Sequence, residues 1–226
     1  MARNLAKRSG GDRHVWMESM VNETIDNPLI EETDLIITVG GDGTILRAVR
    51  VAVEHQIPIL GINMGRLGFM TELRSDEAYS NIPRYLDGNG WLEKRSMLKI
   101  RVVGDDPVNG SRDGIEYHAL NDAVIGRGAI ARLIRVKAMV NDVHLTSYRS
   151  DAVIISTATG STGYNLSAGG PILHPEAPEM ILKPVAPHVG LATAVVLSSA
   201  SIIRLVIESE ESAILSVDGY QDVSLV

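Results

Sequence analysis

The sequence predicts an N-terminal α/β domain joined to a C-terminal antiparallel β-sandwich. A buried-strand pattern, a glycine-rich turn, a helical pattern and a second apolar run follow one another over residues 35–62, which is typical of a βαβ unit with a parallel sheet. Later in the chain, short alternating runs at regular spacing indicate antiparallel strands. We therefore expect an α/β domain over residues 1–95 and a β-sandwich over residues 96–226.

The composition is that of an ordinary globular protein, and it excludes several classes of protein. The chain has 226 residues, of which 45% are hydrophobic and 22% are charged. A net charge of −7 argues against nucleic acid or a membrane surface as partner, and the absence of cysteine excludes disulfides and thiolate metal sites. Because no apolar run suits a membrane helix or a signal peptide, we expect a cytoplasmic protein.

The first glycine loop, Gly40-Gly-Asp-Gly-Thr44, separates the strand run Leu35–Val39 from a helical pattern over residues 45–53. Such a turn presents backbone N–H groups to a phosphate at the positive end of the helix dipole. A carboxylate in the same turn repels phosphates, so Asp42 needs another role, such as accepting a proton or holding a metal. The alternative is that the Asp42 side chain only caps the helix.

The second glycine loop, Asn63–Thr71, follows the strand run Ile57–Ile62. Ligands of open α/β sheets lie beyond the carboxyl ends of the strands, and both glycine loops lie at such ends, so they should line the same crevice. A second helix is predicted over Ser75–Leu86, with Ser75 or Asp76 as its cap.

The β half contains a series of predicted strands and one clear hairpin turn, Asn141-Asp142. In the run Leu120–Ile125, an Asn121-Asp122 pair interrupts apolar residues; such a pair is either functional or a simple bulge or turn. The predicted strands cover residues 98–103, 134–140, 143–148, 151–156, 194–197, 202–207 and 213–217.

The segment Thr157–Pro171 is rich in hydroxyl side chains and glycines and directly follows a predicted strand. Many donors and little side-chain bulk suit close approach to a polar ligand with ring and ribose edges. A flexible linker is the alternative, but the apolar residues in and after the segment favour ordered packing. Several other signatures are absent from the sequence: a P-loop, a dehydrogenase fingerprint, zinc-ligand spacing and the protein-kinase signature.

The order of these motifs resembles the NAD kinase family over about residues 34–220. The resemblance rests on the two glycine loops, the Asn-Asp pair, and three later stretches: Asp151, Thr159-Gly-Ser-Thr-Gly-Tyr164 and Pro184-Val-Ala-Pro-His188. The first glycine loop alone is shared with lipid kinases and approximately with phosphofructokinases, whereas the Gly-Ser-Thr-Gly-Tyr and Asn-Asp stretches resemble NAD kinases specifically.

The resemblance implies a Rossmann-like N-terminal domain, a C-terminal β-sandwich, and NAD bound between them. It implies phosphorylation of the 2′-hydroxyl of the adenosine ribose of NAD, with ATP or polyphosphate as donor and a divalent metal, Mg²⁺, as cofactor. A neighbouring subunit completes the site in the family, so a homodimer or homotetramer is expected.

The resemblance also assigns roles to individual residues of this sequence. Asp42 would be the base, and Asp42, Gly43 and Arg47 would lie near the diphosphate. Asn121 and Asp122 would contact adenine and ribose. Further NAD-contacting positions would be Arg132, Arg149, Asp151, Thr162, Gly163, Tyr164, Asn165, Leu166, Ser167 and Ala186.

The sequence departs from the family pattern in three places. Asp122 stands where the family usually has Glu, and Tyr220 is inserted into the Asp-Gly-Gln stretch that begins at Asp218. The family's first strand and its final segment have no counterpart here, so this is either a compact member or a shortened chain.

Two other functions remain open at this stage. A lipid or sugar kinase would share the first glycine loop, but it would have no obvious use for the Thr159–Tyr164 stretch. A non-catalytic dinucleotide sensor would keep both loops without transferring a phosphoryl group.

Overall fold

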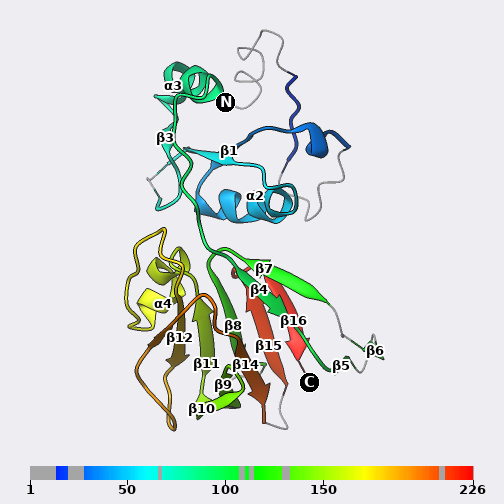
Figure 1. The fold of residues 1–226 in the computed structure, drawn as a ribbon, viewed down its shortest axis with the longest axis vertical. Coiled ribbons are helices and arrows are strands. Elements are labelled where there is room, and N and C mark those ends of the chain that lie inside the picture. The colour runs from blue at the N-terminus through cyan, green and yellow to red at the C-terminus, as the bar shows by residue number, and fades with distance from the viewer. Residues whose placement is uncertain are drawn as a thin grey trace. The chain divides into compact units, whose positions relative to one another are not determined.

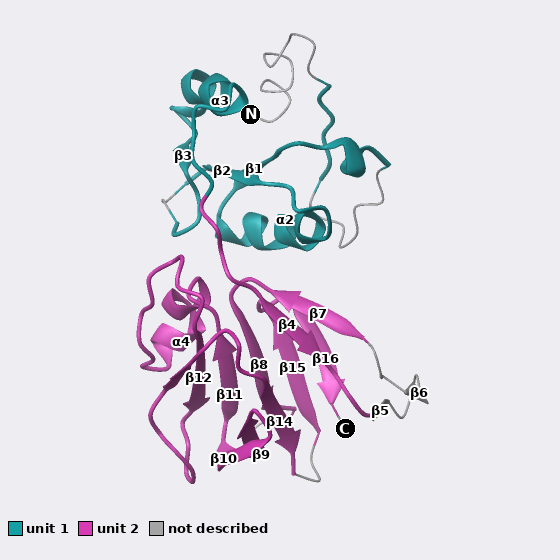
Figure 2. Ribbon diagram, viewed as in Figure 1, with its two compact units in different colours: residues 1–92 teal, residues 93–226 magenta. Residues whose placement is uncertain are grey.

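The computed structural model describes residues 14–19, 28–65, 68–106, 110–111, 115–128, 133–208 and 212–225. The chain divides into two compact units, residues 1–92 and residues 93–226, each formed by one continuous stretch of chain (Figure 2). Within the described stretches, no helix is long and apolar enough to cross a membrane.

Unit 1 is built on a three-stranded parallel sheet in the order β1-β2-β3. Residue Gly40 at the end of β1 pairs with Asn63 at the end of β2, so both glycine loops leave the sheet at the same edge, as predicted. The elements are η1 Pro28–Glu32, β1 Ile36–Gly40, α2 Asp42–His55, β2 Ile59–Asn63, β3 Leu73–Arg74 and α3 Ala78–Leu86.

The helices of unit 1 bury apolar side chains, although Val53, the last position of the helical pattern in α2, is only half-buried. Ile45 and Val49 of α2 are buried, and Ile82 of α3 packs with Leu60 and Ile62 of β2. The predicted cap of the second helix was wrong: residues 75–77 form a turn, α3 begins at Ala78, and its N-cap residue Glu77 makes no side-chain capping bond.

Unit 2 contains two antiparallel sheets, in the orders β13-β12-β11-β8-β15-β16 and β10-β9-β14, and two short strand pairs (Figure 1). Its helical elements are η2 Gly160–Thr162 and α4 Tyr164–Ser167. Its strands are β4 Leu98–Arg101, β5 Asp105–Asp106, β6 Gly110–Ser111, β7 Glu116–Ala119, β8 Asp122–Arg127, β9 Ile134–Val140, β10 Val143–Ser150, β11 Ala152–Ser156, β12 Met180–Val185, β13 Val195–Leu197, β14 Ile203–Ile207, β15 Ala213–Val217 and β16 Gln221–Leu225.

The two sheets of unit 2 share one apolar core. Val136 and Tyr148 of the smaller sheet belong to the same buried cluster as Val153, Leu182 and Leu215 of the larger sheet. The packing of one sheet face on the other confirms the predicted C-terminal antiparallel domain. The predicted hairpin turn is also confirmed, because residues 141 and 142 both adopt positive φ angles between β9 and β10.

The central strand β11 fixes which residues meet at each end of the larger sheet. At one end Ser156 pairs with Asp122 of β8 and Ile181 of β12; at the other end Ala152 pairs with residues 126 and 185. Since an extended chain rises about 3.3 Å per residue, residues 151 and 156 stand roughly 17 Å apart along the strand. This separation divides the predicted site residues of unit 2 into two groups.

Candidate active site

The first glycine loop joins β1 directly to α2 because its glycines allow a close turn. A Cβ atom at Gly40 would lie 2.1 Å from Oγ1 of Thr44, so a larger residue cannot occupy that position without displacing the Thr44 side chain. Gly41 is the N-cap residue of α2, and the space where a Cβ of Gly43 would stand is open. The backbone at the start of α2 is therefore accessible to an anion.

Asp42 ties the first glycine loop to the second. Its Oδ2 accepts a hydrogen bond from the backbone N–H of Phe69 at 2.9 Å, and its Oδ1 accepts one from Met70 at 3.2 Å. The helix-cap alternative for Asp42 was wrong, because Gly41 holds the cap position and no side-chain capping bond forms. Gly68 makes this contact possible, since a Cβ there would lie 2.2 Å from Oδ1 of Asp42.

The described residues of the second glycine loop are held by side-chain hydrogen bonds of their own. Oδ1 of Asn63 accepts the backbone N–H of Gly65 at 2.6 Å, and Nδ2 of Asn63 donates to Oγ1 of Thr71 at 3.1 Å. On this fixed backbone, Phe69 is 74% exposed and Met64 is 54% exposed. Arg47, also exposed, lies in α2 just beyond the turn that begins with Asp42. Unit 1 thus presents open backbone, a carboxylate and uncovered apolar side chains.

In unit 2 the 120–122 turn, Leu120-Asn121-Asp122, leads from β7 into β8. The sequence pattern suggested that the Asn121-Asp122 pair interrupts an apolar strand. In the structure the pair stands at the start of the strand instead, because β8 begins at Asp122. The backbone N–H of Thr157 donates to the carbonyl of Asn121 at 2.9 Å, and Oγ1 of Thr157 donates to the carbonyl of Leu120 at 2.5 Å. The turn is therefore fastened to the end of β11.

The opposite side of the 120–122 turn is held by Asp218, a residue to which the sequence assigned no role. Its carboxylate accepts the backbone N–H groups of Leu120, Asn121 and Asp122 at 2.9, 2.7 and 3.0 Å. The Asp-Gly pair at 218–219, between two alternating runs, is the sequence signal of the hairpin turn that carries it. Nothing in the local pattern indicates that the carboxylate bonds to a turn about a hundred residues earlier.

Two carboxylates thus lie close together in a buried environment. Burial, and secondarily the charge of Asp218, raises the pKa of Asp122 to about 6. Burial also raises the pKa of Asp218, against the opposing effect of its three backbone hydrogen bonds. Near neutral pH, Asp122 therefore carries a charge that is readily neutralised by a proton or compensated by a donor such as a ribose hydroxyl.

The segment after β11 is ordered, as predicted, and its first part packs on the 120–122 turn. A Cβ at Gly160 would lie 2.1 Å from the carbonyl oxygen of Asn121, so this glycine allows the close approach. Oγ of Ser161 donates to Ala158 at 2.6 Å and accepts the backbone N–H of Leu173 at 3.0 Å. These bonds close the segment into a compact loop.

The predicted contact residues in this loop differ in their exposure. Tyr164 is 44% exposed and Leu166 is 41% exposed, and Ser167 is exposed as well. Thr162 and Gly163 are half-buried. Asn165 is fully buried, and its Nδ2 donates to the carbonyls of Ser161 and Pro171 at 2.9 and 2.8 Å. Asn165 therefore shapes the loop, whereas Tyr164 and Leu166 present their side chains to solvent.

The remaining predicted contact residues lie at the other end of the larger sheet. Asp151 precedes β11 and pairs with Arg127 at 3.1 Å; Ala186 follows β12 with a φ of 45°; and Arg149 is exposed near the end of β10. A single chain does not bring this group to the 120–122 turn. Arg132 lies outside the described residues.

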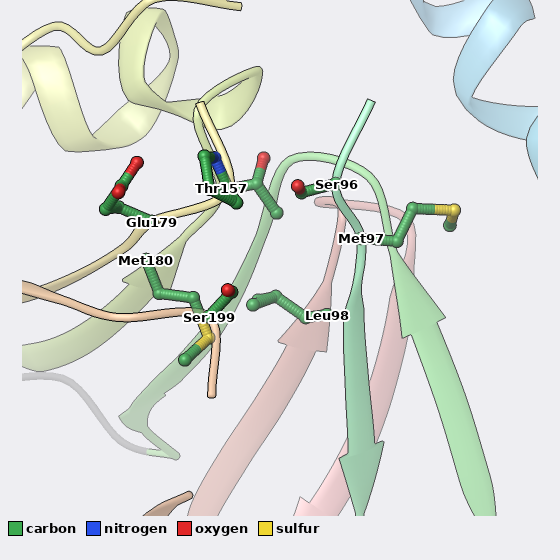
Figure 3. A pocket seen from close by; sticks show the side chains of 8 residues that line it. Ser96, Met97, Leu98, Thr157, Glu179, Met180 and Ser199 are labelled. Carbon is green, nitrogen blue, oxygen red and sulfur yellow. The ribbon is translucent and has the colours of Figure 1, made fainter. Parts of the chain in front are cut away.

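Thr157, which fastens the 120–122 turn, is also one of the residues that line a small cavity of unit 2 (Figure 3). The volume of the cavity is about 170 Å³, below the roughly 300 Å³ at which ligand pockets usually begin, so it does not suit a dinucleotide. Within the described residues, no group of three or more His, Asp or Glu side chains is placed to hold a metal. The cavity is lined by Ser96, Met97, Leu98, Thr157, Pro178, Glu179, Met180 and Ser199.

A parallel unit with a phosphate-type loop, followed by an antiparallel unit with a hydroxyl-rich loop, defines a two-domain nucleotide phosphotransferase. An ATP-NAD kinase N-terminal domain model matches residues 5–89, and an ATP-NAD kinase C-terminal domain model matches residues 120–226. The chain belongs to the NAD kinase family, and the predicted family and enzyme class are confirmed.

Relatives and solved structures agree with this assignment. An NAD kinase of Dehalococcoides mccartyi is 42% identical over 91% of this chain and 71% of the relative, and one of Chloroflexus aurantiacus is 38% identical over 89% and 71%. Yeast NADH kinase complexed with NADH superimposes with a TM-score of 0.74 at 31% identity, covering 86% of this chain and 59% of that one. An Archaeoglobus fulgidus NAD kinase in complex with ATP gives 0.70 at 29% identity, covering 88% and 74%.

The pKa shift of Asp122 predicts a pH-dependent stability. An aspartate of the unfolded chain titrates near 3.8, so between pH 4 and about 6 the native state keeps its proton more tightly than the unfolded state does. The free energy of unfolding therefore falls as the pH rises through this window. Asp122→Asn removes the titration, so the variant should become more stable relative to wild type as the pH rises from 4 to 7. The relative free energy of unfolding should change by up to about 3 kcal/mol, which appears as a rise in the melting temperature of the variant relative to wild type.

Thermal unfolding followed by circular dichroism at both pH values measures this difference. Asp142→Asn is the matched control, because Asp142 is an exposed aspartate of the same unit. A difference between Asp122→Asn and wild type that stays constant from pH 4 to pH 7 would contradict the raised pKa.

Proposed function

We propose that this chain transfers the terminal phosphoryl group of ATP to the 2′-hydroxyl of the adenosine ribose of NAD, giving NADP and ADP. The observation that carries the proposal is the fixed position of Asp42, in a glycine loop whose adjoining backbone is open to phosphates. A carboxylate of this kind can accept a proton from a hydroxyl, which a loop that only bound phosphates would not require.

In the proposed reaction the ribose 2′-oxygen forms a bond to the terminal phosphorus of the donor. The bond from that phosphorus to the bridging oxygen breaks, and ADP leaves with the electron pair. The proton of the hydroxyl passes to the Asp42 carboxylate. Phosphoryl transfer depends mainly on positioning and on neutralising charge, which backbone N–H groups at the start of α2 and the exposed Arg47 suit.

A divalent metal would neutralise charge on the transferring phosphates. Mg²⁺ is usually bound by one or two carboxylates together with substrate phosphates. Asp42 is the carboxylate of the first glycine loop, so it would share such an ion with the donor rather than form a site of protein ligands alone. Polyphosphate offers the same phosphate chemistry as ATP and is an alternative donor.

The adenosine part of NAD is assigned to the 120–122 turn and to the loop around α4. The Asn121 side chain would bond the adenine edge, Asp122 would accept from a ribose hydroxyl, and the exposed ring of Tyr164 would stack on the base. Thr162, Gly163, Leu166 and Ser167 would line the same surface, with Asn165 acting by shaping the loop.

The separation of the predicted contact residues supports an assembly of at least two chains. Arg149, Asp151 and Ala186 lie at the opposite end of the larger sheet from the 120–122 turn, so they reach an adenosine bound there only from a second chain. We therefore propose a homodimer or homotetramer in which each site is completed by a neighbour.

Asp42→Asn should lower kcat by about 10²- to 10⁴-fold, because it removes the base while keeping the shape of the side chain. Formation of NADP from NAD and Mg-ATP, with polyphosphate tested separately, measures the rate. NAD should still bind to within about tenfold by calorimetry. A wild-type chain that binds NAD yet makes no NADP with either donor would instead identify a dinucleotide sensor.

Thr71→Val is the control that separates chemistry from loop anchoring. It removes the bonds of Oγ1 to Asn63 and Gly68 and so loosens the second glycine loop without touching the Asp42 carboxylate. We expect its kcat to fall far less than that of Asp42→Asn. Equal losses of kcat in the two variants would indicate that Asp42 only anchors the loop. Recovery of the activity of Asp42→Asn at high Mg²⁺ would indicate that Asp42 is a metal ligand.

Tyr164→Ala should raise the KM for NAD by roughly 5- to 30-fold and leave the KM for ATP nearly unchanged, since one stacking contact between a base and an aromatic ring is worth about 1–2 kcal/mol. Steady-state kinetics with each substrate varied in turn measures the two constants. Ile202→Ala, at an exposed apolar residue before β14, is the control for general surface effects. A rise in the KM for ATP alone would reverse the assignment.

Mixing two inactive variants tests the shared site. Asp42→Asn and Asp151→Ala chains should each be nearly inactive, because each damages every site of its own assembly. Mixed dimers contain one site with both residues intact, so mixing after dissociation and reassembly should recover about a quarter of the wild-type activity, by statistical pairing. No recovery in mixtures shown by mass spectrometry to contain mixed oligomers would place both residues of each site in one chain.

A further inference from the structure

The hairpin between β15 and β16 carries an aspartate in a backbone conformation that most residues avoid. Asp218 has a φ of 51° and Gly219 a φ of 72°, and the backbone N–H of Tyr220 donates to the carbonyl of Val217 at 3.3 Å. Positive φ angles at residues 218 and 219 are those of a type I′ turn, which accepts Asp and Gly readily. Since Val217 pairs with Gln221, Tyr220 is a third residue of the connection. The turn directs the side chain of Asp218 inward, where the residue is only 9% exposed.

The Asp218 carboxylate satisfies three consecutive backbone N–H groups of the 120–122 turn. Oδ2 accepts from Leu120, and Oδ1 accepts from both Asn121 and Asp122. The backbone N–H of Asp218 in turn donates to the carbonyl of Asp122 at 2.9 Å. Buried N–H groups need acceptors, so removal of this one side chain would leave three of them to find others.

Two residues from different parts of the chain thus hold the backbone of the 120–122 turn, one through its N–H groups and the other through its carbonyl groups. Asp218 receives the N–H groups, and Thr157 donates to the carbonyls of Leu120 and Asn121. This arrangement fixes the backbone from which the side chains of Asn121 and Asp122 project. Neither bond set uses those two side chains, which leaves them for a ligand.

We propose that Asp218 is a positioning residue for NAD: it holds the 120–122 turn in the conformation that presents Asn121 and Asp122 to the adenosine. This inference rests on the proposed function for the identity of the ligand. Asp218 itself does not touch the dinucleotide. Its loss should weaken NAD binding without affecting the donor or the chemical step.

Asp218→Gly tests the inference most directly, because glycine keeps the positive φ of the hairpin turn and removes only the carboxylate. Asp218→Asn keeps the size of the side chain and tests the charge. For both we expect the KM for NAD and the calorimetric Kd for NAD to rise roughly 5- to 150-fold. The KM for ATP, and kcat at saturating NAD, should stay within about threefold of wild type.

Asp222→Asn is the matched control, since Asp222 lies in the same hairpin, is exposed, and accepts a hydrogen bond from its cross-strand partner Ser216 at 2.6 Å. Its constants should match wild type. A folded Asp218→Gly with an unchanged Kd for NAD would overturn the inference. The inference would also be overturned if kcat and the affinities for both substrates fell in proportion to the folded fraction. Unfolding of both Asp218 variants would have the same meaning, because Asp218 would then serve folding alone.

The calorimetric measurement separates this inference from the proposed function. If wild type bound NAD but transferred no phosphoryl group, the proposed function would fail while the comparison of Kd values still decided the role of Asp218. If wild type formed NADP and both Asp218 variants bound NAD normally, only the inference about Asp218 would fail.

Discussion

Each unit relies on a carboxylate that accepts backbone N–H groups from a loop distant in the sequence. Loops at strand ends cannot satisfy all their polar groups within the sheet, and glycine-rich loops have few side chains with which to do it. Asp42 supplies acceptors to residues 69 and 70, and Asp218 supplies them to residues 120–122. Asp42 thereby joins the two glycine loops, and Asp218 fixes the turn to which adenosine contacts are assigned, so the same kind of interaction stabilises the fold and shapes the site.

The two carboxylates differ in how far they are free for chemistry. Asp42 is half-buried at the start of a helix and makes one hydrogen bond with each oxygen, which leaves further lone pairs available. Asp218 is buried and bonds three N–H groups, so it is committed to the backbone. Asp122 lies between these extremes: it is buried, its pKa is raised, and the charge beside it comes from Asp218.

The βαβ unit, both glycine loops and the 134–148 hairpin followed from the sequence because each depends on contacts between near neighbours in the chain. A two-residue turn at 141–142 and an apolar run before Gly40 are local signals. The first helix residue of α3 was misplaced, since Ser75 and Asp76 look like caps but belong to a preceding turn.

What sequence reasoning missed depends on pairing over long distances. The bonds of Asp218 to residues 120–122 follow from strand register, which pairs β15 with β8. The register across six strands cannot be predicted from the sequence of any one segment. A family resemblance assigns contact residues to a ligand, but it does not reveal that one chain holds them at two separate ends of a sheet.

The second glycine loop combines a backbone that is held by hydrogen bonds with apolar side chains that remain largely exposed. Asn63, Thr71 and Asp42 hold its described backbone, while most of the surface of Phe69 and much of that of Met64 remains in water. A ligand or protein surface that covers these side chains therefore gains hydrophobic free energy with little loss of backbone entropy. In calorimetric terms, such binding carries a negative heat-capacity change without the large unfavourable entropy of coupled folding.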